Sequence, residues 1–246
     1  LARISQQLVR LAQDAPVPEP LESFNVKQPD PDTILGFLKE QSFKTLTAKV
    51  ASNLGVDGDI RTAPQETAPI ETEYELVTTR ERLDAWVAEA YERGLLAIDT
   101  ETTSLNAHQA ELVGISLSTE PGRACYIPIA HRNEAAGELS LDGNGAVPNL
   151  PIADAVASLK EILLDPAVLK IGQNIKYDME VLVRHGLSIH CIDDTMVLSY
   201  VLDGGQHGHG MDELAELYLN HQTIKFADVA GTGTDAVTFD RVPLDK

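Results

Sequence analysis

The sequence has no long apolar run and only two cysteines. No apolar stretch approaches the roughly 20 residues that a helix needs to cross a bilayer, and we see no signal peptide. Cys125 and Cys191 both lie in apolar sequence. We interpret them as buried, reduced thiols, with a disulfide or a metal-binding pair as the alternative. These absences favour a cytoplasmic protein that does not contact membranes.

Basic residues are also scarce, since 19 Lys and Arg stand against 38 Asp and Glu, for a net charge of −19. Residues 1–70 carry 7 basic and 9 acidic side chains, whereas residues 71–246 carry 12 and 29. A free-standing protein that binds DNA tightly normally has a basic face, which this composition argues against. The charge remains compatible with a catalytic domain that neutralises phosphates with metal ions.

The chain of 246 residues is long enough for one substantial core and a smaller appendage. Residues 1–50 include a proline-rich stretch and two short helical patterns. Residues 51–72 are rich in Gly, Pro, Thr and charge, which predicts a linker. Because the chain begins with Leu1 rather than Met, we interpret it as part of a longer polypeptide.

Regular patterns begin near residue 73 and predict an α/β domain. Strands are expected at residues 74–77, 95–102, 111–118, 123–129 and 168–172. Helices are expected at residues 78–93, 154–164, 175–185, 194–202 and 211–219. Glycines and Pro148 predict a long loop over residues 133–150. Strands first and alternating helices later indicate a mixed sheet flanked by helices.

Two acids follow the apolar run of residues 95–98. Strand side chains alternate between faces, so Asp99 and Glu101 are expected on one face and Thr100 on the other. Two neighbouring carboxylates repel each other unless a positive charge lies between them. Paired carboxylates suit a hard divalent ion such as Mg²⁺ or Mn²⁺.

A third acid occupies a similar place after the strand expected at residues 168–172. Asn174 is a natural N-cap, which would put Asp178 about one turn into the next helix. Taken alone, Asp178 is most simply a solvated acid that the helix dipole favours. Taken together, the two acidic motifs indicate a site.

These motifs, in this order, resemble those of the DEDD family of 3′–5′ exonucleases, and in particular the proofreading domain of bacterial family A DNA polymerases (the DNA polymerase I family). Residues 99–105 (DTETTSL) resemble the first exonuclease motif, and residues 174–178 (NIKYD) the second. Residues 194–200, 211–215 and 223–233 resemble the sequence that leads toward the third motif.

The resemblance covers residues 73–246 and implies a ribonuclease H-like mixed β-sheet flanked by helices. It also implies hydrolysis with two divalent ions, Mg²⁺ or Mn²⁺, about 3.5–4 Å apart. By this resemblance Asp99 bridges the ions, Glu101 binds the ion on the nucleophile side, and Asp178 completes the shell of the other. Residues 1–50 resemble the end of the 5′-nuclease domain that precedes it in these polymerases.

The resemblance further implies a substrate, the 3′ end of single-stranded or frayed DNA. Five residues within the matching segments are expected to contact it: Thr100, Leu105, Asn174, Tyr177 and Phe226. Leu105 and Phe226 match positions that press on the last bases, where stacking contributes about 1–3 kcal/mol per base. Alternatively, Leu105 is a core residue and Asn174 only a cap. The implied partners are covalently linked 5′-nuclease and polymerase domains, in a monomer.

The third motif of the family, Tyr-x-x-x-Asp, does not occur between Phe226 and Lys246. The resemblance places it shortly beyond Lys246, so we expect the chain as printed to be C-terminally incomplete and inactive by itself. Two other functions remain open: a ribonuclease D-like RNA 3′-exonuclease, and a noncatalytic spacer between nuclease and polymerase domains. His207 and His209 are interpreted as loop residues, with a metal clip as the alternative.

Overall fold

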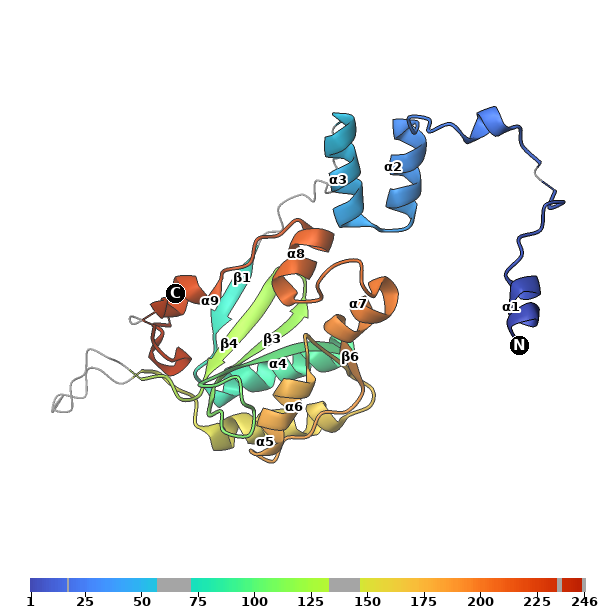
Figure 1. Ribbon diagram of the computed structural model, residues 1–246. Helices are drawn as coiled ribbons and strands as arrows, with labels where there is room; N and C mark the ends of the chain where they lie inside the picture. Colours follow the sequence, from blue (N-terminus) through green and yellow to red (C-terminus); the bar gives the residue numbers. More distant parts are fainter. Residues whose placement is uncertain (17, 57–71, 133–146, 234–235, 245–246) are drawn as a thin grey trace. The chain divides into compact units, whose positions relative to one another are not determined.

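The structure is a computed structural model that describes residues 1–16, 18–56, 72–132, 147–233 and 236–244 (Figure 1). The chain divides into two compact units, Leu1–Thr62 and Ala63–Lys246. No helix in the described part of the chain is both long and apolar enough to cross a membrane.

The first unit contains a helical hairpin. Its elements are α1 (Ala2–Leu8), the 3₁₀ helix η1 (Leu21–Phe24), α2 (Pro31–Glu40) and α3 (Lys44–Leu54). Helix α2 begins with Pro31 at its first turn and with the Asp30 carboxylate accepting from the Thr33 N–H. Helix α3 ends at Gly55, which adopts the left-handed conformation. Helix α3 continues through Leu54, so its last turn overlaps the segment predicted as a linker. Residues 57–71 of that segment lie outside the described residues.

The second unit is built on a six-stranded sheet in the order β1-β4-β3-β2-β5-β6. The strands are β1 (Glu73–Leu76), β2 (Leu95–Thr102), β3 (Leu112–Glu120), β4 (Arg123–Pro128), β5 (Leu169–Gly172) and β6 (Ile192–Asp194). Strand β3 is antiparallel to β2 and β4, whereas the other pairs are parallel. The predicted mixed β-sheet flanked by helices is thereby confirmed.

The helices of this unit are α4 (Arg80–Arg93), α5 (Ile152–Leu164), α6 (Lys176–Val183), α7 (Thr195–Asp203), α8 (Met211–Leu219) and α9 (Phe226–Ala230), followed by the 3₁₀ helix η3 (Phe239–Arg241). Helix α4 packs against β2, β3 and α5. Their apolar side chains form one core that includes Trp86, Ile98, Leu117 and Leu159. The predicted helices are confirmed to within two residues at either end.

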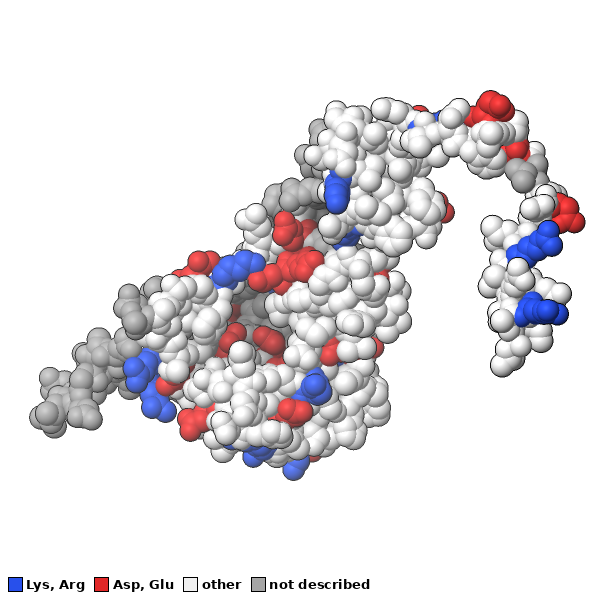
Figure 2. All heavy atoms as spheres, in the orientation of Figure 1, with Lys and Arg blue, Asp and Glu red and all other residues white. Residues whose placement is uncertain are grey.

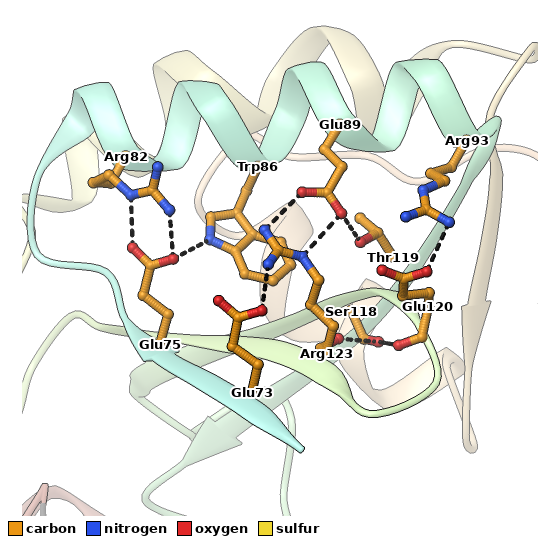
Figure 3. Close-up of polar contacts among 10 residues, drawn as sticks. All are labelled: Glu73, Glu75, Arg82, Trp86, Glu89, Arg93, Ser118, Thr119, Glu120 and Arg123. Carbon is orange, nitrogen blue, oxygen red and sulfur yellow. Dashed lines mark hydrogen bonds and ion pairs between the residues drawn. The ribbon is translucent and has the colours of Figure 1, made fainter. Parts of the chain in front are cut away.

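Strand β1 is attached to the rest of the unit by a polar network on the α4 side of the sheet (Figure 3). Glu75 accepts hydrogen bonds from Arg82 and from the Trp86 indole. The Arg123 guanidinium lies 4.6 Å from the centre of the Trp86 ring and pairs with Glu89 at 2.8 Å. These contacts join an edge strand to α4 and β4.

The two cysteines differ in burial. Cys125 is buried and free as expected, but Cys191 is exposed, so the prediction that it is buried is wrong. It follows His190 and directly precedes the edge strand β6. Most of the loop expected at 133–150 lies outside the described residues.

Candidate active site

Asp99 and Glu101 lie on the face of the sheet that α4 and α5 do not cover. Asp99 pairs with Ser116 of β3, and Glu101 pairs with Gly114. Paired residues on neighbouring strands share a face, so β3 presents small side chains beside both acids. Figure 2 shows acidic side chains around a hollow on the face in view.

Asp178 lies beside this pair, in the first turn of α6. Its carboxylate accepts hydrogen bonds from the Thr100 backbone N–H at 2.9 Å and from the Thr100 hydroxyl. Strand β5 pairs with β2 only as far as Ala97, so the Thr100 N–H is left free for Asp178. An acid 78 residues away in the sequence is thereby fixed next to Asp99 and Glu101.

The three carboxylates affect one another electrostatically. Burial, followed by the charges of Asp99 and Asp178, raises the pKa of Glu101 to about 7. Burial also raises the pKa of Asp178 to about 6, with a further contribution from Asp99 and an opposing one from the Thr100 hydrogen bonds. Burial raises the pKa of Asp99 as well. A cation between these groups would stabilise their charged forms.

The donor set fits a hard divalent cation, because it consists of carboxylate oxygens. Within the described ranges, however, no three His, Cys, Asp or Glu side chains converge closely enough to enclose one ion. Among the described residues, His207 and His209 likewise belong to no such group. The Nδ1 of His209 is 2.8 Å from the Ser199 hydroxyl, and His207 lies 3.7 Å from Asp203.

The Thr100 side chain, which was predicted to contact the substrate, points away from the solvent. It is buried, and its hydroxyl holds Asp178 instead. The Tyr177 hydroxyl is also bound within the protein, to the Thr102 hydroxyl and the Ser104 carbonyl. Tyr177 thereby fixes the segment before Leu105. Leu105 itself is 97% exposed and is not a core residue.

Asn174 does not cap α6, so that prediction is wrong. Its φ is +55°, and the N-cap position is held by Ile175, whose side chain forms no capping hydrogen bond. The Asp194 carboxylate instead accepts from the backbone N–H groups of Asn174 and Ile175, both at 3.0 Å. It also caps α7 through the N–H of Met196. The Asn174 side chain is exposed and does not cap the helix.

Phe226 is 59% exposed at the start of α9 and stacks on Phe239, with ring centres 6.2 Å apart. Phe239 contacts His131 edge-on at 6.0 Å, and His131 contacts Tyr126 in the same way at 5.6 Å. These three residues next to Phe226 were missed by sequence reasoning. The alternating side-chain pattern of β4 could have indicated Tyr126, because Tyr126 pairs with Ser116, which in turn pairs with Asp99.

Comparison with known proteins identifies the family. Residues 74–246 match the sequence model of a family described as a 3′-5′ exonuclease. The chain belongs to this exonuclease family. The family is one of nucleases. Strand β2 carries two of the three candidate acids, and helix α6 carries the third.

Relatives of this exonuclease chain include two bacterial enzymes named DNA polymerase I. The protein from Rhizobium leguminosarum is 34% identical over 319 aligned residues, which cover 100% of this chain and 31% of the relative. The protein from Pseudomonas aeruginosa is 35% identical over 252 residues, covering 100% and 26%. The chain thus spans about a quarter to a third of the length of these relatives.

Among solved structures, NrnC of Brucella melitensis with bound Mg²⁺ is 22% identical, with a TM-score of 0.44. The match covers 63% of this chain and 65% of that one. A likeness of this degree carries no argument about function.

Proposed function

We propose that residues 73–246 form the proofreading 3′–5′ exonuclease domain of a DNA polymerase I. The domain would hydrolyse the 3′-terminal phosphodiester of single-stranded or frayed DNA. The observation that carries the proposal is the pair of hydrogen bonds from Thr100 to Asp178, which fixes Asp178 beside Asp99 and Glu101. This arrangement occurs in a chain that matches an exonuclease family over residues 74–246.

Asp99, Glu101 and Asp178 would hold two divalent ions, Mg²⁺ or Mn²⁺. When bound, such ions activate a water molecule and stabilise the leaving 3′-oxygen. The residues of the chain supply the positioning: Thr100 holds Asp178, and the strand holds Asp99 and Glu101 on one face. The mutual repulsion of these buried acids supports cation binding, because a cation would relieve it.

Leu105 and Phe226 would receive the last bases of the strand, and their exposure supports this role. Stacking on apolar side chains tolerates any base, which an editing site requires. Asn174 and the ring of Tyr177 would line the same path. We further propose covalently linked 5′-nuclease and polymerase domains, a third motif beyond Lys246, and a monomeric state.

The test is trimming of a 5′-labelled single-stranded DNA oligonucleotide with Mn²⁺. The assay uses the full natural polypeptide, because the third motif is expected beyond Lys246. The wild type should shorten the oligonucleotide from its 3′ end, and Asp178→Ala should abolish trimming. A matched control, Glu92→Ala, removes an exposed acid on α4 and should trim like the wild type.

Two further measurements distinguish the proposed function from the two alternative functions. An RNA oligonucleotide that is trimmed faster than DNA would favour a ribonuclease D-like enzyme. Complete absence of trimming with every metal would favour a noncatalytic spacer. Trimming that persists in Asp178→Ala would place the active site elsewhere.

A further inference from the structure

Tyr126 of β4 borders the carboxylates. A Cβ added to Gly114 would lie 1.9 Å from the Tyr126 hydroxyl oxygen, so only glycine allows the phenol to lie there. Gly114 is the register partner of Glu101. The charge of Glu101 also contributes, after burial, to a raised pKa of the Tyr126 phenol. The phenol therefore forms the side of the site next to Glu101.

His131 holds this phenol in place. Its Nε2 lies 2.7 Å from the Tyr126 hydroxyl, and its Nδ1 lies 3.1 Å from the Val242 carbonyl oxygen. A carbonyl only accepts, so Nδ1 carries the proton and Nε2 of the neutral ring accepts from Tyr126. Burial lowers the pKa of His131, which favours that neutral ring.

The His131 imidazole also supports the two phenylalanines near the site, Phe239 and Phe226. Phe239 packs edge-on against His131, and Phe226 stacks on Phe239. The buried His131 side chain thus contacts both Tyr126, which lies next to Glu101, and Phe239, on which Phe226 stacks. The backbone of His131 is fixed in turn by the Asn149 side chain, which bonds its N–H at 3.0 Å and its carbonyl at 2.9 Å.

We propose that Tyr126 is a positioning residue of the exonuclease site and that His131 fixes it there. The phenol confines the Glu101 carboxylate to the side of Asp99 and Asp178. Without this wall, repulsion among the acids would drive Glu101 over Gly114 toward β4. The inference rests on the proposed function, because it assigns the wall a role in holding the metal ligands together.

Two substitutions at His131 separate its contacts. The amide of His131→Asn reaches the Nδ1 position and can still donate to Val242, but it loses the acceptor for Tyr126. The amide of His131→Gln reaches the Nε2 position and keeps that acceptor. Tyr126→Phe removes the hydroxyl and keeps the ring, and Tyr91→Phe removes an exposed hydroxyl on α4 as the matched control.

The measurement is the Mn²⁺ dissociation constant of each variant of the full natural polypeptide, with the melting temperature recorded without metal. Tyr126→Phe and His131→Asn should weaken Mn²⁺ binding by about tenfold, the lower end of the effect of losing a residue that orients metal ligands. His131→Gln should recover most of the affinity, and Tyr91→Phe should match the wild type. Melting temperatures should not follow this order.

The inference is overturned if Tyr126→Phe and His131→Asn bind Mn²⁺ like the wild type. It is also overturned if both His131 variants lose affinity and melting temperature equally, which would indicate a purely structural role. In either case Asp99→Asn should still abolish binding, which leaves the proposed function intact. If the wild type binds no Mn²⁺, the proposed function and this inference fall together.

Discussion

At the residue scale, Glu101 carries the electrostatic strain of the site. Burial and two neighbouring acids raise its pKa from the usual 4.5 to about 7 in the metal-free chain. Between these values the folded state binds a proton that the unfolded state has released, so stability falls as the pH rises. The loss above pH 7 is up to about 3 kcal/mol at 1.36 kcal/mol per pKa unit.

We therefore expect the metal-free chain to be more stable at pH 5 than at pH 7.5, as measured by urea unfolding. Glu101→Gln should remove most of this difference, because glutamine does not titrate. Added Mg²⁺ should also reduce it, since the cation favours the charged carboxylates. A pH dependence that is the same in Glu101→Gln and the wild type would contradict this explanation.

Thr100 gives a second prediction at this scale. Thr100→Val removes the hydroxyl that binds Asp178 and leaves the backbone N–H in place. A lost hydrogen bond to a buried charged group costs about 1.5–3 kcal/mol, and urea unfolding should show a loss of this size. Thr100→Ser keeps the hydroxyl and should lose much less. Equal losses in the two variants would show that the bond contributes little.

At the scale of elements, strand β1 depends on the network around Arg123. Arg123→Ala removes the pairs with Glu89 and Glu73 and the contact with the Trp86 ring. The Arg123 side chain is one-quarter exposed, so we expect a loss of only about 1–2 kcal/mol. Arg93→Ala, which breaks the more exposed pair with Glu120, should lose less than about 1 kcal/mol.

This network lies on the face of the sheet opposite the carboxylates. Mn²⁺ affinity should therefore be unchanged in Arg123→Ala at temperatures where the variant is folded. A large loss of metal affinity would show that the two faces of the sheet are coupled.

The elements differ in how far the sequence alone could predict them. Strand β2 and its two acids were predictable, because the apolar run and the alternation are local. The contact between Thr100 and Asp178 joins residues 78 positions apart and was not predicted. The family resemblance implied only that Asp178 lies close to Asp99 and Glu101. The double role of Asp194 was not predictable, since it depends on how close the starts of α6 and α7 lie. The three-residue strand β6 is too short for a recognisable pattern.

The position of His131 illustrates the same limit. Its partners Tyr126, Val242 and Phe239 come from three segments, and one of them is 111 residues away in the sequence. No local pattern in the sequence distinguishes such a histidine from a surface one. Only the folded arrangement reveals that it is buried between rings.

At the scale of the whole molecule, the acidic charge would oppose binding of the proposed DNA substrate. Residues 71–246 carry 29 acidic and only 12 basic side chains. DNA should therefore bind only when divalent ions offset this charge at the site. We expect an oligonucleotide with a cleavage-resistant phosphorothioate end to bind with Mg²⁺ and to be lost in EDTA, as followed by fluorescence anisotropy. Equal binding in both conditions would show that another surface holds the strand.

The central claim is that Asp99, Glu101 and Asp178 together bind the divalent ions. Crystals of the full natural polypeptide grown with Mn²⁺ and measured near the manganese absorption edge test it most directly. The account predicts anomalous density in contact with Asp99, and with Glu101 and Asp178 as its neighbours. Manganese bound elsewhere, or Asp178 turned away from the ion and the other two acids, would contradict it.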